Sequence, residues 1–395
     1  MSLFKLNNVI QNYAWGSKES ISKLFGIDNS EHQPQAEIWM GAHPNGCSRV
    51  ASTGELLSDV IAQDSKNMFG DYTARRFGEL PYLFKVLAAE TPLSIQVHPS
   101  KHKAEAGFAR ENEQGIALDS ACRNYKDPNH KPELVYALTF YKAMNGFRPI
   151  SQIVSLFQQA GIESLSVEVS ALESKPNSNG LREFFTAVMS LDEQSKANVL
   201  ADLEQALKLG PKTALLREVF EYVAEFKKHY PNDIGLLSPF ILNTIELAPG
   251  EAMFLHAETP HAYVQGTGLE IMANSDNVLR AGLTPKHIDV DELIDNTRFQ
   301  STNPDNIKLL PIEKEGKLSY PIPVDDFGFD IVTVSDVTRQ QYLRSAEILF
   351  CVEGEVVIEV EQQKLLLRPG DSVFISNDSG VYQCQGNGIL ARAYN

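Results

Sequence analysis

The sequence has few cysteines and no closely spaced pair of them. Cys47, Cys122, Cys351 and Cys384 lie far apart, and no CxxC pair occurs. This spacing argues against a disulfide framework or a compact cysteine metal site. It favours free, buried thiols in a reducing compartment.

Long apolar runs and basic residues are also scarce. No run approaches the roughly 18 residues of a membrane span, and MSLFKLNNVIQNYAW lacks the features of a signal peptide. The 35 Lys and Arg face 51 Asp and Glu, and the net charge of −16 disfavours non-specific binding to nucleic acid or anionic membrane. We expect a soluble cytoplasmic protein with neither partner, in which any anionic ligand needs a local basic cluster.

The patterning divides the chain into β-rich ends and a helical middle. The 395 residues suggest two or three domains at roughly 150 residues each. Strand-like runs occupy 36–149, among them YLFKVLAA at 82–89, which equally fits a helical turn, LSIQVH at 93–98 and ELVYALT at 133–139. Helical spacing takes over between 150 and about 240, and short strand-like runs then return.

One internal repeat organises the β-rich parts. LAPGEAMFL at 247–255 and LRPGDSVFI at 367–375 match position for position as strand, Pro-Gly-acidic turn and strand. EILFCVEGEVVIEV, before the second copy, is expected to form a hairpin that turns at Glu353-Gly354-Glu355. We predict a mainly β protein with two small jelly-roll barrels and a helical block inserted in or after the first.

The two copies of the repeat differ in one residue that carries chemistry. Pro260-His261-Ala262-Tyr263 follows the first copy, whereas Val381 stands at the position of His261 after the second. Because barrel position alone needs no imidazole, the contrast favours a chemical role for His261, although a lone histidine is more often structural.

Three further side chains can complete a metal site. Gln96 and His98 are two apart on an expected strand and leave the same face, and Glu133 begins the strand LVYAL. With His261 they make an N,N,O,O set suited to Zn²⁺, with Mn²⁺, Fe²⁺ or Co²⁺ as alternatives. The competing interpretation is a half-exposed strand whose polar residues face solvent.

The segment 268–286 mixes carboxylates, amides and cations directly after His261. Arg280 and Lys286, with Lys85 and Lys131, can form the cluster that an anion needs. The alternative is a solvated loop of mixed charge.

Taken together, the motifs resemble a known family. They are Tyr13-Ala-Trp15-Gly16, Glu37-Ile-Trp39-Met40-Gly41, Leu93-Ser94-Ile95-Gln96-Val97-His98-Pro99, His130-Lys131-Pro132-Glu133, Pro260-His261-Ala262-Tyr263 and Ser275-Asp276-Asn277-Val278-Leu279-Arg280-Ala281-Gly282. In this order, and along the whole chain, they resemble the type I mannose-6-phosphate isomerase family of the cupin superfamily. The helical block looks closer in length to that of the bacterial members than to the fungal and animal ones.

The resemblance implies a fold and a site. It implies a catalytic cupin domain at 1–149 and 240–315, a helical domain at 150–239 and a metal-less cupin domain at 316–395. One Zn²⁺ per chain would be held by Gln96, His98, Glu133 and His261. The remaining site residues that it implies are Arg280, Lys131, Glu270 and His130 as catalytic candidates, and Lys85, Ser94, Lys286, Tyr263 and Trp15 as residues that line or border the site.

The implied activity interconverts mannose 6-phosphate and fructose 6-phosphate through a cis-enediol, so that the enzyme supplies or consumes mannose 6-phosphate in nucleotide-sugar metabolism. Arg280 would stabilise the enediolate, Glu270 or Lys131 would be the base, and Lys85 or Lys286 would bind phosphate. A phosphorylated hexose is then the partner, and the chain a monomer or weak homo-oligomer. The rivals are an iron-dependent oxygenase and a sugar-binding cupin without activity.

Overall fold

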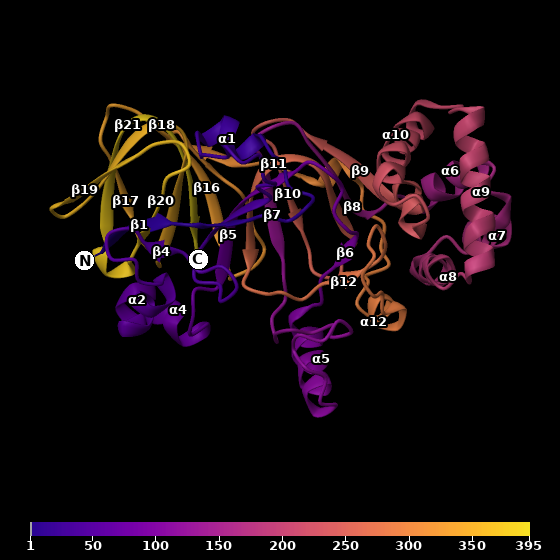
Figure 1. Ribbon diagram of the computed structural model, residues 1–395, viewed down its shortest axis with the longest axis horizontal. Coiled ribbons are helices and arrows are strands. Elements are labelled where there is room, and N and C mark those ends of the chain that lie inside the picture. The colour runs from indigo at the N-terminus through magenta and orange to yellow at the C-terminus, as the bar shows by residue number, and fades with distance from the viewer. Residues whose placement is uncertain (1) are drawn as a thin grey trace.

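The computed structural model describes residues 2–395, which form two antiparallel sheets and a lobe of helices (Figure 1). The 11-stranded sheet contains β2 (Val9–Gln11), β3 (Glu37–Met40), β5 (Tyr82–Ala89), β6 (Gln96–Val97), β7 (Glu133–Ala137), β8 (Tyr141–Phe147), β9 (Leu242–Leu247), β10 (Ala252–Leu255), β11 (His261–Ala273), β12 (Leu279–Arg280) and β13 (Lys308–Leu309). The 10-stranded sheet contains β1 (Leu3–Asn7), β4 (Arg49–Val50), β14 (Ile312–Lys314), β15 (Lys317–Ser319), β16 (Gly328–Val334), β17 (Arg339–Tyr342), β18 (Glu347–Val360), β19 (Gln363–Leu367), β20 (Ser372–Ile375) and β21 (Val381–Tyr394).

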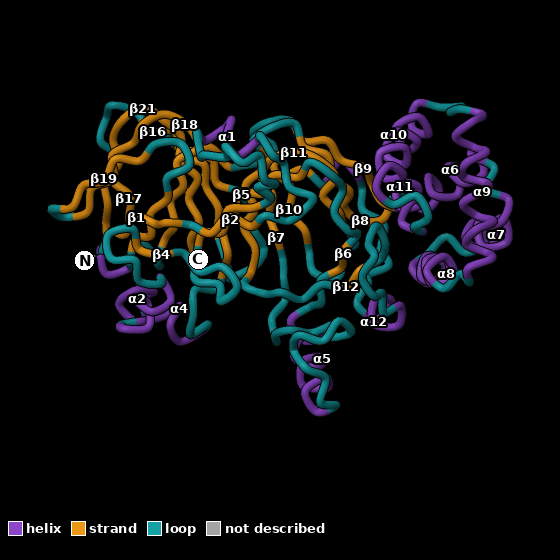
Figure 2. The backbone as a smooth tube through the Cα atoms, in the orientation of Figure 1, coloured by secondary structure: helices purple, strands orange, loops and turns teal. Residues whose placement is uncertain are grey.

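The helical lobe lies beyond the first sheet, at the end of the molecule opposite the second (Figure 2). It comprises α6 (Ile150–Ala160), α7 (Ser166–Ser174), α8 (Ser178–Met189), α9 (Glu193–Leu209), α10 (Ala214–His229) and α11 (Ser238–Ile241). Asn177, Asp192 and Thr213 cap α8, α9 and α10 by accepting backbone N–H groups. Because β8 and β9 flank the lobe and pair with each other, the helices are an insertion within the first sheet.

Six further helices lie outside the lobe. Four of them fall between residues 36 and 149, and the sequence indicated none of these four. These four are α2 (Leu57–Gln63), α3 (Ser65–Phe69), α4 (Asp71–Arg76) and α5 (Lys101–Glu113), and the others are α1 (Ser20–Phe25) and α12 (Val290–Asp295). The segments that form α2 to α5 lie between the apolar runs of 36–149. The helices α2, α3 and α4 are about two turns long or shorter, so their sequences show little helical periodicity.

The repeat found in the sequence recurs in the structure. Gly250 and Gly370 occupy the two turns with φ values of 94° and 89°, a conformation that favours glycine. Glu251 accepts a hydrogen bond from the Ala248 backbone N–H, and Asp371 accepts the equivalent bond from Arg368. The Pro-Gly-acidic pattern is therefore a conserved piece of turn geometry in the two halves of this chain.

Two local predictions were wrong. EILFCVEGEVVIEV forms one continuous strand, β18, with a register shift between Cys351 and Glu353 where a hairpin turn was expected. Gly354, with φ of 77°, therefore lies next to an irregularity in the strand pairing and does not form a hairpin turn. The four cysteines are free, as expected, but only Cys351 and Cys384 are buried, whereas Cys122 is exposed.

The two sheets share one hydrophobic core. Phe84 of β5 packs edge-on against Phe329 of β16 and Phe350 of β18, with ring centroids 6.1 and 6.4 Å apart. In addition, β1 pairs with β20 in the second sheet, with Leu3 opposite Ile375. The predicted division that begins the first domain at residue 1 remains a prediction, but this strand pairing ties the N-terminus to the C-terminal sheet. None of the helices among residues 2–395 is long and apolar enough to cross a membrane.

Candidate metal centre and substrate pocket

Neighbouring strands bring the expected metal ligands to one end of the first sheet. His261 begins β11 and lies opposite Gln96 of β6, which in turn lies opposite Arg280 of β12. Glu133 begins β7, which pairs with β11 along its length. The pairings of β6 with β11 and β12 place Gln96 between His261 and Arg280, whereas Glu133 lies opposite Met272 near the other end of β11.

The ligand atoms of His98, Glu133 and His261 lie within 4.8 Å of one another. The Nε2 atoms of His98 and His261 each lie 3.4 Å from one oxygen of the Glu133 carboxylate. All three side chains are at most 3% exposed. The set is thus a closed, buried group of two imidazoles and one carboxylate.

The protonation pattern of this group fits a cation. His98 Nδ1 lies 2.6 Å from the Asn277 carbonyl and His261 Nδ1 lies 2.9 Å from the Thr259 carbonyl, so each Nδ1 carries the proton and donates it. Among the described residues 2–395, the buried Nε2 of His98 finds no hydrogen-bond partner. Burial and the charge of Lys131 lower the pKa of His98 to about 4, which leaves a lone pair facing a carboxylate oxygen. A metal ion bound between the His98 lone pair and the carboxylate oxygen would remove the repulsion between them.

Glu133 is held ionised by its surroundings. Lys131 Nζ lies 2.9 Å from one oxygen, and the Tyr263 hydroxyl donates to the other at 3.1 Å. Burial opposes ionisation, but the attraction of the Lys131 ammonium outweighs it and holds the pKa of Glu133 well below its usual value. The carboxylate is therefore available as an anionic ligand at neutral pH.

A second buried charge group lies beside the first on β3, β5 and β11. Lys85 Nζ lies 3.0 Å from Glu270 and 3.6 Å from Glu37, and 5.1 Å from the centre of the Trp39 ring. The two carboxylates outweigh burial and raise the pKa of Lys85. Burial raises the pKa of Glu270. Lys85 is therefore cationic but already engaged by two acids.

A cavity of about 770 Å³ opens beside these groups. Its lining includes Gln96, together with Arg280 and Lys286, Ser94, Trp15 and Glu37. Among residues 2–395, neither Arg280 nor Lys286 has an ion-pair partner, and the charge of Arg280 lowers the pKa of Lys286. Two neighbouring cations without a carboxylate make a place for an anion in an acidic protein.

The structure does not bring every expected residue into this cavity. His130 points elsewhere: its Nε2 lies 3.0 Å from both oxygens of Asp326, and it lines a separate pocket with Arg76 and Lys101. Asp326 follows His130 by 196 positions, so this partner was invisible in the HKPE motif. Lys85 and Glu270 lie in the buried charge group, and Lys131 and Tyr263 beside the metal ligands, as described above.

Several lining residues were not predicted from the sequence, and four of them lie close to the proposed site groups. Tyr13 stacks on Trp15 with ring centroids 5.7 Å apart, and Glu37 faces the cavity from β3. Both belong to motifs already quoted, which was the available signal. His229 and Tyr230 come from the end of α10 in the helical lobe, and no pattern in the sequence indicates a functional role for them.

Two jelly-roll-type sheets, a helical insertion and a buried two-histidine, one-carboxylate set in one half define a metal-dependent cupin enzyme. Three family profiles match the chain: Phosphomannose isomerase type I, catalytic domain, at 3–150, its helical insertion domain at 156–242, and the Mannose-6-phosphate isomerase cupin domain at 316–395. The chain therefore belongs to the type I phosphomannose isomerase family, and the predicted fold of two cupin barrels plus a helical domain is confirmed.

Individual relatives agree along the full length. Mannose-6-phosphate isomerase of Escherichia coli is 48% identical over 396 residues, covering 99% of both chains, and that of Homo sapiens is 33% identical over 412 residues, covering 96% of this chain and 94% of the human one. A lysine-to-alanine mutant of phosphomannose isomerase from Salmonella typhimurium superposes with a TM-score of 0.95 at 48% identity, and a zinc-bound mannose 6-phosphate isomerase with 0.94 at 48%, each covering 100% of both chains.

Proposed function

We propose that this chain is a zinc-dependent aldose-ketose isomerase that interconverts mannose 6-phosphate and fructose 6-phosphate through a cis-enediol. The observation that carries the proposal is the buried Nε2 lone pair of His98 facing the Glu133 carboxylate, next to a cavity with two unpaired cations. The names of the relatives supply the substrate and the metal.

In this proposal His98, Glu133, His261 and Gln96 hold the metal. Bound zinc supplies Lewis-acid stabilisation of negative charge on substrate oxygens. The His98 and His261 rings are fixed in orientation by their bonds to the Asn277 and Thr259 carbonyls, which prepares the site before the ion enters. Lys131 and Tyr263 keep Glu133 in place from the other side.

Arg280 and Lys286 bind and orient the anionic substrate. Arg280 is half-buried at the strand pair that holds Gln96, so its charge lies close to the reacting carbons and stabilises an enediolate. Lys286 is exposed at the cavity rim and binds the phosphate, with Ser94 and Trp15 on the lining beside it. Lys85 already forms ion pairs with two carboxylates, so its role in this proposal is to position Glu270.

The proton between C1 and C2 is moved by Glu270 or Lys131. Glu270 has a raised pKa, which suits a base that must also return its proton near neutrality. Lys131 lies 2.9 Å from a metal ligand. Glu270→Gln and Lys131→Met distinguish them, because loss of the base stops exchange of the substrate C2 proton with solvent, whereas loss of a positioning residue slows it.

We also propose the division into a catalytic cupin domain at 1–149 and 240–315, a helical domain at 150–239 and a metal-less cupin domain at 316–395. Three further points stay predictions. They are a cytoplasmic location, a role in supplying or consuming mannose 6-phosphate for nucleotide sugars, and a monomeric or weakly oligomeric state.

A coupled assay with mannose 6-phosphate tests the function. Fructose 6-phosphate formation should vanish on chelation and return with added Zn²⁺. No turnover by the zinc-replete protein would contradict the isomerase, and O₂ consumption by the iron-loaded protein would then favour the oxygenase.

A further inference from the structure

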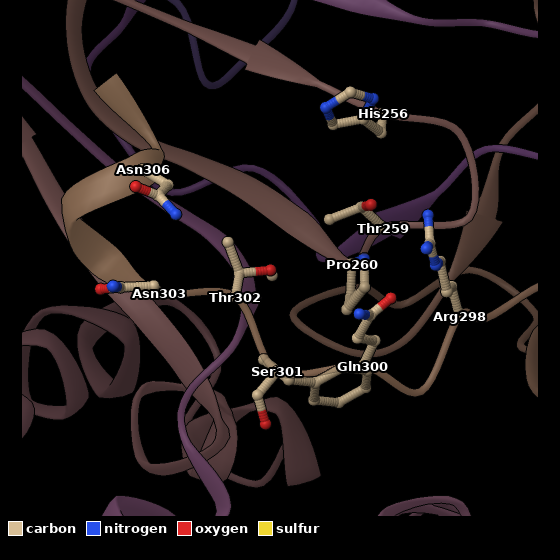
Figure 3. Close-up of a pocket in the computed structure, with 11 residues that line it drawn as sticks. His256, Thr259, Pro260, Arg298, Gln300, Ser301, Thr302, Asn303 and Asn306 are labelled. Carbon is tan, nitrogen blue, oxygen red and sulfur yellow. The ribbon is translucent and has the colours of Figure 1, made fainter. Parts of the chain in front are cut away.

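A second hollow, of about 270 Å³, borders the segment that leads into His261. Thr259 and Pro260, the two residues before this ligand, form part of its wall (Figure 3). His256 and Arg298 border it on the same side, and Thr302 and Asn306 lie across from them (Figure 3). The volume falls just below the usual range for ligand pockets, which suits a small ligand.

Most of the lining side chains are polar. It holds one guanidinium, one imidazole and several hydroxyl and amide groups, and none of its described residues is an aspartate or glutamate. The chain as a whole has a net charge of −16. A pocket without carboxylates is therefore unusual in this acidic protein, and its side chains are of the kinds that bind anions.

Two side chains of the hollow, Arg298 and His256, can interact with an anion, and both are exposed to solvent. Within residues 2–395 the Arg298 guanidinium and the His256 imidazole make no ion pair and no side-chain hydrogen bond. Glu258, the carboxylate closest to them in sequence, is instead paired with Lys103 at 2.9 Å. Partial burial and the charge of Arg298 lower the pKa of His256, so Arg298 supplies the positive charge of the hollow and His256 a neutral hydrogen-bonding group.

The walls of the hollow are fixed by backbone contacts. The Arg298 N–H donates to the Glu258 carbonyl at 2.8 Å, and the Gly146 N–H donates to the Pro260 carbonyl at 2.9 Å. Gly146 has φ of 70°, and a Cβ there would lie 2.5 Å from the Thr302 hydroxyl oxygen. The hollow therefore depends on glycine at this position for its shape.

The hollow is connected to the metal centre through one residue. The Thr259 carbonyl accepts the Nδ1 proton of His261, the bond that aims Nε2 at Glu133. Thr259 therefore takes part in both places: it lines the hollow, and its carbonyl holds the His261 ring.

We propose that this hollow binds a small phosphate-bearing anion through Arg298 and His256, and that its occupancy changes turnover at the metal by shifting the turn that orients His261. The binding half of the proposal stands by itself. The effect on turnover rests on the proposed function.

Calorimetry with inorganic phosphate tests the binding on the zinc-loaded, full-length protein. Phosphate also fits the substrate cavity, so we expect two binding events in the wild type. Arg298→Gln should lose one of them, with affinity at least fivefold weaker, and Arg280→Ala should lose the other. Arg182→Gln removes an exposed arginine on the helical lobe and should keep both. A single event that vanishes in Arg280→Ala, or two events unchanged in Arg298→Gln, would overturn the site.

Repeating the titration with glycerol 3-phosphate separates the sources of the ligand. Tighter binding at the Arg298-dependent site than with inorganic phosphate would identify a phosphate monoester as its ligand, and weaker binding would identify free phosphate.

Inhibition kinetics test the connection to the metal. Phosphate in the substrate cavity raises KM alone, whereas phosphate in the hollow changes kcat. We expect a kcat component of inhibition in the wild type and Arg182→Gln that is absent in Arg298→Gln. Purely competitive inhibition in a wild type whose calorimetry shows the Arg298-dependent event would refute the coupling. The calorimetry needs no turnover, so failure of the proposed function would leave it intact.

Discussion

At the scale of single residues, the two halves of the chain contain their own comparison. β11 begins at His261 and β21 begins at Val381, and both strands follow the same strand, turn and strand unit. The first half uses an imidazole at this strand start, where the second uses an aliphatic side chain. The difference is the simplest account of why metal chemistry belongs to the first half.

His261→Val imposes the residue of the second half on the first. Because it removes one of two nitrogen ligands and leaves Glu133 without that partner, we expect Zn²⁺ affinity to fall at least about 100-fold. Metal content after dialysis against a buffered zinc concentration measures this. His102→Asn, an exposed histidine on α5, is the control and should keep its zinc. Full zinc occupancy in His261→Val would show that the ion binds elsewhere.

Arg280→Ala should separate metal binding from catalysis. Removing this cation should lower kcat/KM by about 100-fold or more, roughly 3 kcal/mol of transition-state stabilisation, while zinc content stays at the wild-type level. Steady-state kinetics and metal analysis of the same preparation provide the two readouts. Near wild-type turnover with unchanged zinc would remove Arg280 from the mechanism.

At the scale of elements, the second sheet has a glutamate at the position that matches Glu133, but this glutamate has a different partner. Glu133 lies opposite Leu255, and Glu347 lies opposite Ile375 at the matching position of the repeat. Each carboxylate accepts a tyrosine hydroxyl at 3.1 Å. In the second sheet, however, Arg392 donates to Glu347 and Asp330, so a guanidinium supplies the positive charge there.

Removing this guanidinium should cost stability. Arg392→Met leaves buried Glu347 without a cation and Asp330 with only the Lys317 ammonium at 3.7 Å, and we expect the free energy of unfolding to fall by about 3–5 kcal/mol. Urea denaturation followed by fluorescence measures the change. Arg368→Met breaks an exposed pair with Glu355 and should cost at most about 1 kcal/mol. Equal losses in the two variants would refute a special role for the buried cluster.

The end of α10 brings the helical lobe to the substrate cavity. His229 lines the cavity together with Arg280 and Lys286, and the Tyr230 hydroxyl donates to the Pro92 carbonyl, which fixes the helix end against the strand side. The lobe therefore contributes part of the wall of the cavity proposed to bind the substrate.

His229→Gln should weaken binding more than it slows chemistry. Losing an imidazole next to the anion-binding cations should raise KM about three- to tenfold, with kcat within twofold of the wild type. Lys228→Gln is the matched control, since Lys228 shares the partner Glu225 but does not line the cavity. An unchanged KM in His229→Gln would exclude the helix end from the site.

At the scale of the whole molecule, the sequence was informative wherever function lies in local patterns. Gln96, His98, Glu133 and His261 could be selected because each sits at a strand end with a distinctive neighbour, and the repeat predicted the two β halves. The block at 150–239 was recognisable because helical periodicity persists over many turns.

What the sequence could not show are contacts between distant segments. The pairing of β1 with β20, the His130–Asp326 contact and the arrival of His229 at the cavity each depend on how separate elements pack. Short helices such as α3 and the irregular β18 were missed because five residues, or one bulge, leave no distinct period.

Titration of the metal-free protein with Zn²⁺, with the rate of mannose 6-phosphate isomerisation measured at every step, tests the central claim most directly. We predict that the rate rises linearly and reaches its plateau at one zinc per chain, and that His261→Val stays inactive over the same range. Full activity before any zinc is added, or a plateau at two ions per chain, would contradict a single catalytic metal held by His98, Glu133 and His261.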